Sequence, residues 1–301
     1  DNVGNKEEIQ KFEFYVDNTP PMIVEEIMGN TFVANGLEYS SGRSKYKITA
    51  MDNKAGVKSI HYQVGNGESK EYTEPFYLNS ANGTLKIKTW VYDKVNNKSY
   101  GGSQNSKQGA AYIDLTGPSL KNKFSGPYLL SRDTVFIAQT TKLILTASDS
   151  ESGLDRIDYS IDGKAEEKYE KPFSLDVDGL HRVVYNGHDK VGNTSQADFF
   201  FIVDNAGPKI NIDYSVESIG SKTALDRKIK VYPSHLQVFL SATDNLAGLE
   251  KIYYKINDGK FIPYSTSIKN FDKGRDYKLS IKSIDRLGNE SKEEVIISIN
   301  L

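Results

Sequence analysis

The sequence of 301 residues contains no cysteine. This absence excludes disulfides, thiolate metal sites and cysteine nucleophiles. No apolar run approaches the roughly 18 residues of a membrane helix, so this part of the chain is not expected to span a membrane. The only methionines are Met22, Met28 and Met51, and the first residue, Asp1, belongs to a turn motif. We therefore expect any initiator methionine or signal peptide to lie outside this sequence.

An excess of charge of one sign is also lacking. The 38 Lys and Arg residues nearly balance the 40 Asp and Glu residues, which gives a formal net charge of -2. Nucleic acids and anionic membranes favour a basic face, so neither is expected as the main partner. Enzyme motifs are missing as well: the four histidines are scattered, and no nucleophile elbow or phosphate loop occurs. We predict no catalytic residues.

What the chain does have is an internal repeat marked by three aspartates in a fixed order. A linker Asp precedes proline in VDNTPP, IDLTGP and VDNAGP, and a second Asp follows a strand-like run in TAMDNKAG, TASDSESG and SATDNLAG. A third Asp opens DKVNN, DKVGN and DRLGN, and DNVGN opens the chain. The first two landmarks are 35, 35 and 40 residues apart, and the second and third are 41, 40 and 41 apart. This regularity indicates a repeated structural unit.

These landmarks predict the domain boundaries. Residues 1–17 are expected to be the terminal hairpin of a preceding repeat, and whole repeats are expected at 18–114, 115–204 and 205–301, as a piece of a longer array. Between landmarks the apolar residues alternate with period two, which is typical of half-buried strands. Roughly seven short strands in about 95 residues, joined by Gly and Asn turns, predict an Ig-like β-sandwich. The expected fold is all-β, with tandem Ig-like β-sandwich domains in an elongated array.

Turn chemistry explains much of the third landmark. Its fourth position holds Gly4, Asn96, Gly192 or Gly288, the two residue types that best tolerate a positive φ in a tight hairpin loop. The leading Asp can accept hydrogen bonds from backbone N–H groups two or three residues later. The same reasoning applies to the second landmark, in which glycine follows Asp by four residues.

The order of these motifs resembles bacterial Ig-like repeats, in particular the subgroup named after an outer-membrane protein and often appended to surface proteins and glycosidases. The resemblance covers nearly the whole chain and includes Tyr-x-x-Pro-Phe at 72–76 and 169–173. The third repeat departs from it with YSTSI at 264–268, so different packing is expected there. The resemblance implies a spacer or adhesive module outside the cytoplasm, on the cell surface or in the periplasm, and implies no enzymatic activity.

In an Ig-like sandwich the entering linker and the two landmark loops lie at one end, so the aspartates should form three groups. These are Asp17, Asp52 and Asp93; Asp114, Asp149 and Asp189; and Asp204, Asp244 and Asp285. Three close carboxylates repel unless a cation or donors compensate, and each group could hold Ca²⁺ with added carbonyls and water. In the alternative reading each Asp caps its own turn and the side chains never meet, with Lys94, Lys190 and Arg286 neutralising the third Asp.

A second candidate site is aromatic. Trp90, the only tryptophan, is out of phase with the core residues of its strand, and together with Tyr92 and Tyr100 it could stack on a sugar or a partner protein. The alternative is packing beneath a neighbouring loop. The polar insertion GGSQNSKQG at 101–109 is read as a surface loop.

Two functions from different classes follow. The first is a non-catalytic spacer or stalk of a larger bacterial surface protein, with adhesive contacts to protein or glycan. The second is an accessory carbohydrate-binding region of a surface glycoside hydrolase. Loss of polysaccharide binding on Trp90→Ala would favour the second.

Overall fold

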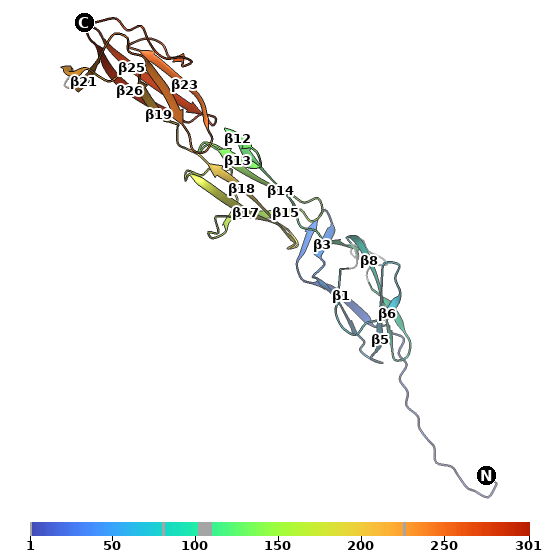
Figure 1. The fold of residues 1–301 in the computed structure, drawn as a ribbon. Helices are drawn as coiled ribbons and strands as arrows, with labels where there is room; N and C mark the ends of the chain where they lie inside the picture. The colour runs from blue at the N-terminus through green and yellow to red at the C-terminus, as the bar shows by residue number, and fades with distance from the viewer. Residues whose placement is uncertain (1, 80–81, 102–109, 225–226) are drawn as a thin grey trace. The chain divides into compact units, whose positions relative to one another are not determined.

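The computed structural model describes residues 2–79, 82–101, 110–224 and 227–301, and the statements below concern these residues. The described chain is built of strands and contains no helix. No segment of it could therefore cross a membrane as a long apolar helix. The strands form three pairs of sheets in sequence order, which confirms the predicted all-β fold of tandem Ig-like β-sandwiches (Figure 1).

The first pair of sheets contains strands β1 to β10. Their bounds are β1 Met22–Met28, β2 Thr31–Ala34, β3 Leu37–Ser41, β4 Lys45–Met51, β5 Val57–Val64, β6 Ser69–Glu71, β7 Phe76–Tyr77, β8 Gly83–Asp93, β9 Lys98–Tyr100 and β10 Ala110–Asp114. One sheet has the order β1-β4-β7. The other has the order β2-β3-β10-β8-β5-β6, with β9 also beside β8.

The second and third pairs repeat this plan with eight strands each among the described residues. The second contains β11 Ser119–Ser125, β12 Tyr128–Ser131, β13 Thr134–Ile137, β14 Lys142–Ser148, β15 Leu154–Ile161, β16 Glu167–Lys168, β17 Gly179–Asp189 and β18 Thr194–Val203. The third contains β19 Lys209–Tyr214, β20 Gly220–Ala224, β21 Arg227–Tyr232, β22 Val238–Thr243, β23 Leu249–Ile256, β24 Ile262–Pro263, β25 Asp276–Asp285 and β26 Glu290–Ile299. The orders β12-β13-β18-β17-β15-β16 and β20-β21-β26-β25-β23-β24 match.

Contacts divide the chain into two compact units. Unit 1 contains 1–119 together with the loops at 147–156 and 187–195, and unit 2 contains 120–146, 157–186 and 196–301. The two landmark loops of the second repeat thus belong to the same unit as the first repeat. The predicted boundaries at residues 17, 114 and 204 remain a prediction.

The cores contain the alternating apolar residues of the landmark strands. Ile48, Leu145 and Val238 are buried, as the period-two pattern predicts. Aromatic pairs extend two of the cores: the rings of Tyr62 and Phe76 stack with centroids 4.1 Å apart, and those of Tyr159 and Phe173 stack at 4.6 Å. Both phenylalanines come from the Tyr-x-x-Pro-Phe motif.

The third repeat keeps two of these contacts despite its different motif. Ile268 is buried and bridges to Val238 as Phe173 bridges to Leu143. Tyr264 meets Tyr254 edge-on at 6.1 Å, as Tyr169 meets Tyr159 at 6.2 Å. A branched aliphatic side chain therefore fills the place of the phenylalanine ring, so the third repeat keeps the backbone bridge but replaces the stacked Tyr–Phe pair with an aliphatic contact.

The segment expected to be a terminal hairpin carries a turn at residues 2–4 but no strand up to residue 21, and its side chains are largely exposed. At the equivalent place in sequence, β18 pairs in parallel with β13 and β26 pairs in parallel with β21. The described residues offer residues 5–16 no such partner strand, and an isolated hairpin is marginally stable in water.

Candidate functional site

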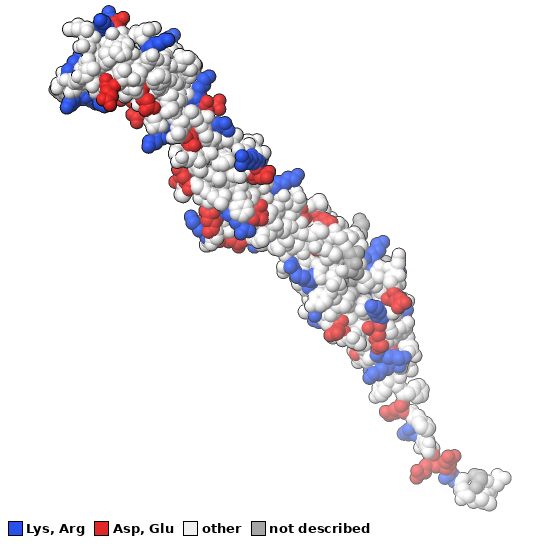
Figure 2. All heavy atoms as spheres, viewed as in Figure 1, with Lys and Arg blue, Asp and Glu red and all other residues white. Residues whose placement is uncertain are grey.

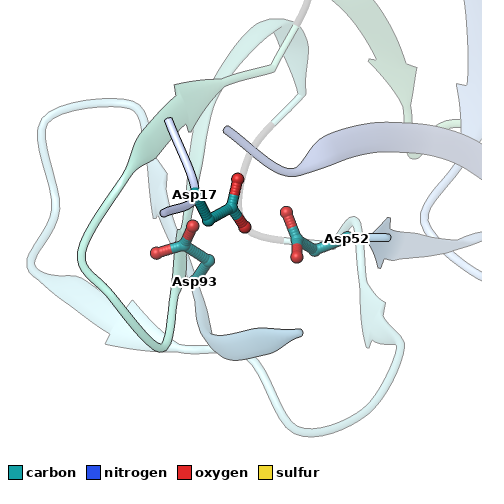
Figure 3. A group of neighbouring side chains, drawn as sticks. All are labelled: Asp17, Asp52 and Asp93. Atoms are coloured by element: carbon teal, nitrogen blue, oxygen red, sulfur yellow. The ribbon is translucent and has the colours of Figure 1, made fainter. Parts of the chain in front are cut away.

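The nine predicted aspartates come together in three triads, one for each repeat. In every triad, one carboxylate oxygen from each Asp lies within 4.8 Å of the others. Figure 3 shows the first triad, in which the carboxylates of Asp17 and Asp52 face each other beside that of Asp93. The prediction that the three landmarks meet is confirmed.

Strand ends position these side chains. Asp93 ends β8, Asp52 follows β4 directly, and Asp17 lies in the linker that enters β1. Asp189 and Asp285 likewise end β17 and β25, while Asp149 and Asp244 follow β14 and β22. The triads therefore recur because the strands end at equivalent positions in each repeat.

Each third-landmark Asp also caps its own turn. Asp93 Oδ1 accepts hydrogen bonds from the N–H groups of Val95 at 2.9 Å and Asn97 at 2.8 Å. Asp189 and Asp285 accept the corresponding bonds. Gly4, Asn96, Gly192 and Gly288 all have positive φ, as the turn chemistry predicts. The third-landmark carboxylates are 0 to 3% exposed, so these bonds form away from bulk water.

The final Asn of the turn has a role that the sequence analysis missed. Asn97 Nδ2 donates to Asp93 Oδ2 at 2.8 Å and to the main-chain carbonyl of Asp17 at 2.8 Å. The carbonyls of Asp114 and Asp204 receive the same bond from Asn193 and Asn289, at 2.9 and 2.8 Å. We name this set of bonds the linker clamp, because it fixes the entering linker to the loop that ends in Asn.

The linker carboxylate completes the connection. Asp17 Oδ1 accepts from Thr19 N–H and Oδ2 accepts from Ala55 N–H, each at 2.9 Å. Asp114 Oδ2 accepts from Ser152 N–H at 3.0 Å, and Asp204 Oδ2 accepts from Ala247 N–H at 2.9 Å. Each linker Asp thus holds the second landmark loop through its carboxylate and the third through its carbonyl.

Turn capping and convergence of the carboxylates therefore occur together and do not exclude each other. Asp52 Oδ1 caps the N–H groups of Lys54 and Gly56, yet its Oδ2 is buried and has no hydrogen-bond partner among the described residues. Two of the three cations suggested for neutralisation contact other groups: Lys190 Nζ lies 4.2 Å from the Phe32 ring centroid, and Lys94 Nζ lies over Gly56.

The electrostatic balance differs between the triads. In the third, burial followed by the charges of Asp244 and Asp285 raises the pKa of Asp204, although backbone hydrogen bonds oppose the shift. In the first, the Thr19 N–H is the main cause that lowers the pKa of the half-buried Asp17 carboxyl. Burial thus disfavours the ionised form of Asp204, whereas the hydrogen bond from Thr19 favours the ionised form of Asp17.

The second triad contains a fourth carboxyl group, that of Glu151. Burial and its hydrogen bond with Asp114 raise the pKa of Glu151, while burial of Asp114 is outweighed by hydrogen bonds with Ser152 and Glu151 that lower its pKa. Glu151 also accepts from Thr116 Oγ1 at 3.2 Å and from Asn82 Nδ2. A proton on Glu151 can therefore offset part of the repulsion in this triad.

The donor set suits a hard cation. The triads supply carboxylate oxygens and no nitrogen or sulfur, and Ca²⁺ takes six to eight oxygens. Each carboxylate oxygen has about two lone-pair sites, so an oxygen that accepts one N–H retains a site for an ion. The unpartnered Oδ2 of Asp52 is an open acceptor of this kind.

The aromatic candidate residues also lie together. Trp90 and Tyr92 lie on the face of β8 opposite the buried Thr89, Val91 and Asp93, as predicted. Tyr100 on β9 pairs with Trp90 and is 53% exposed. The polar insertion beyond Gly101 lies outside the described residues.

Two further residues complete this surface. His61 on β5 pairs with Trp90 and stacks on its ring at 5.8 Å with planes 10° apart. Lys98 Nζ lies 5.5, 5.1 and 4.4 Å from the ring centroids of Trp90, Tyr92 and Tyr100. Hydrogen bonds with Tyr100 and Tyr92 raise the pKa of Lys98. We call His61, Trp90, Tyr92, Lys98 and Tyr100 the aromatic surface.

No protein-family model matches this sequence, and no curated protein matches it. Similar solved structures include one described as "Structural insight into host cell surface retention of a 1.5-MDa bacterial ice-binding adhesin", with 12% identity, coverage of 95% of this chain and 100% of that one, and a TM-score of 0.37. Another, a Ca²⁺-stabilised ice-binding adhesin of an Antarctic bacterium, is 14% identical over 87% of this chain and 71% of that one, with a TM-score of 0.35.

A glucan-utilisation protein of Bacteroides ovatus, SGBP-B in complex with a mixed-linkage heptasaccharide, is 13% identical over 95% of this chain and 71% of that one, with a TM-score of 0.23.

The surface charge agrees with the composition. On the visible face Lys and Arg alternate with Asp and Glu, without a broad basic area (Figure 2). His181 is 7% exposed, and its ring nitrogens lie 2.7 Å from Asp162 Oδ2 and 2.8 Å from the Val177 carbonyl. These bonds tie a strand to two loops.

Proposed function

We propose that this chain is a non-catalytic spacer within a larger bacterial surface or exported protein, and that it separates other elements by stacking Ig-like repeats. The linker clamp carries the proposal. At every repeat an Asn side chain fixes the linker carbonyl and the linker carboxylate fixes a second loop. A chain that needed freely moving domains would not require such bonds, since short flexible linkers suffice.

Small-angle X-ray scattering tests the spacer. A compact 301-residue protein would have a radius of gyration of about 19 Å, and we expect a clearly larger value with a rod-like distance distribution. The double variant Asn193→Ala and Asn289→Ala removes two clamps and should broaden that distribution. Asn122→Ala, an exposed strand residue, is the matched control. A wild-type radius near the compact value would contradict the proposal.

We further propose that the triads bind Ca²⁺ and that the ion stiffens the connection at each linker. The supporting observation is the convergence of three carboxylates with a buried, unpartnered oxygen on Asp52. A cation there would offset the mutual repulsion and occupy the open acceptor. The ion would contact the linker and both landmark loops, the same three segments that the clamp joins.

Asp52→Asn separates metal binding from turn capping. The amide oxygen can keep the bonds from Lys54 and Gly56 while an amide nitrogen replaces the unpartnered oxygen. In wild-type protein, Ca²⁺ at about 100 times its dissociation constant should add about 2.7 kcal/mol to the stability of the first repeat, followed through Trp90 fluorescence. In Asp52→Asn this gain should vanish, with stability in EDTA unchanged or higher. Equal melting temperatures of the wild-type protein in EDTA and in Ca²⁺ would contradict Ca²⁺ binding by the triads.

Glycan binding is the second candidate, favoured by the aromatic surface. Trp90 and Tyr92 are half-buried and Tyr100 is exposed. Partly exposed aromatic rings beside a cation can stack on a sugar and donate to its hydroxyls. We expect affinity-gel or array binding to a bacterial or host polysaccharide, and Trp90→Ala should weaken it at least about ten-fold, or about 1.4 kcal/mol. Phe200→Ala is the control, since Phe200 also lies beside a cation, Arg182 at 5.4 Å. An equal loss of glycan affinity in both variants, or no glycan binding by the wild-type protein, would contradict this second function and leave the spacer as the proposed function.

A further inference from the structure

The third residue of the Asp-x-(Val/Leu)-Gly-Asn turn has a very different exposure in different repeats. Val191 is fully buried and Leu287 is 5% exposed, whereas Val95 is 54% exposed. The three turns share the same internal hydrogen bonds. The difference therefore lies in what covers the turn.

Within unit 2, the covering group is the edge hairpin of another repeat. Leu287 and the adjacent loop residue Ala247 form a buried cluster with Ala138, and Leu129 and Phe136 pack against it. Leu129 lies on β12 and Phe136 on β13, the antiparallel hairpin of the second repeat. The turn of the third repeat thus inserts an apolar side chain against the second repeat.

Within unit 1, the residues on either side of Val191 make contacts with the first repeat. Its neighbour Lys190 lies over the ring of Phe32 on β2, and Arg43 donates to the carbonyl of Gly192. A Cβ on Gly192 would lie 2.7 Å from Asn30 Nδ2, so the two segments approach closely. Phe32 and Leu129 occupy equivalent places, each 15 residues after its linker Asp (32 − 17 and 129 − 114).

The first repeat presents the same groups without such a cover among the described residues. Lys94 Nζ lies 3.5 Å from the place a Cβ on Gly56 would take, and Lys190 Nζ lies 3.6 Å from the equivalent place on Gly153. Lys94 in the first repeat thus has the same position relative to its turn as Lys190 in the second, and Lys190 lies over the aromatic ring of Phe32. A hollow lined by Thr19, Pro20 and Met51 lies beside Asp52 in the first triad.

We propose that Val95, Ala55 and Lys94 form a docking face for the end of another Ig-like repeat of this kind. The partner presents an edge hairpin with an apolar or aromatic side chain in the place of Phe32 and Leu129. That side chain covers Val95, and where it is aromatic its ring lies over Lys94 as the Phe32 ring lies over Lys190. The inference rests on the two occupied contacts, and it holds whether or not the array serves as a spacer.

Thiol labelling tests this face, since the chain has no cysteine of its own. In the chain as it stands, Val95→Cys should react quickly and Val191→Cys at least about 100-fold more slowly, because a covered thiol reacts only after local opening. An extended chain is then made in which residues 115–204 replace 1–17, so that a second copy of Asp204 takes the place of Asp17. There, labelling of Val95→Cys should slow at least about ten-fold, with Val24→Cys on the outer face of β1 unchanged.

Trp90 fluorescence gives an independent measurement, because the added copy has no tryptophan. The unfolding midpoint of the Trp90 signal should rise in the extended chain, and Val95→Asp should abolish the rise. If circular dichroism shows that the copy does not fold, residues 18–114 carrying Trp90→Phe take its place. Unchanged Val95→Cys labelling beside a folded copy overturns the proposal. The proposal is also overturned if labelling of Val95→Cys in the unextended chain slows as the protein concentration rises. That result would assign the face to a second copy of the whole chain.

Discussion

Replacing Asp93 with alanine should lower the free energy of unfolding of the first repeat by about 3 kcal/mol or more, because buried donors lose a charged acceptor at about 1–3 kcal/mol each. The donors are the N–H groups of Val95 and Asn97 and the side-chain amide of Asn97. The carboxylate is fully buried, so water does not readily replace it. Relief of repulsion within the triad offsets only part of this loss.

Urea titration followed by Trp90 fluorescence measures this effect in one repeat. Asp285→Ala makes the same change in the third repeat and should leave the Trp90 transition in place. An Asp93→Ala loss below about 1 kcal/mol would mean that the turn relaxes to satisfy its donors elsewhere. In that case the turn would not depend on its aspartate.

Gly207→Ala should destabilise the third repeat by about 3 kcal/mol, the upper end of the usual range for overpacking. A Cβ at this linker position would lie 2.5 Å from the carbonyl carbon of Glu290 and 2.7 Å from the nitrogen of Ser291. Both are main-chain atoms, so no rotamer change can relieve the contact.

Gly220→Ala is the control for this prediction, since a Cβ there meets nothing within 4 Å. Differential scanning calorimetry with hydrogen exchange of β25 and β26 identifies the repeat that loses stability. Equal stability of the two variants would show that the linker can move away from Glu290. The linker would then be looser than the clamp implies.

Much of the fold and the triads could be predicted from sequence because the signals are local. An Asp followed by glycine four residues later fixes a turn, and period-two alternation fixes the faces of the strands that lead into it. The convergence of Asp17, Asp52 and Asp93 followed from placing these turns at the ends of an Ig-like sandwich. Trp90 was placed on the outer face by counting phase along β8.

The remaining features depend on contacts between distant segments. Asn97 looks like an ordinary turn residue until its amide reaches the carbonyl of Asp17, 80 positions earlier. His61 and Lys98 join the aromatic surface only through cross-strand register. Val95 and Val191 lie in nearly identical pentapeptides, so the sequence does not predict that one is exposed and the other buried. The residues that cover Val191 belong to another repeat.

The parallel pairing of the last strand in each repeat bears on how the chain would respond to tension. β10 runs parallel to β3, β18 to β13 and β26 to β21. A pull applied between Asp17 and Asp114 would draw β10 along its own axis. The hydrogen bonds that pair β10 with β3 and β8 would then be loaded together in shear instead of breaking one after another.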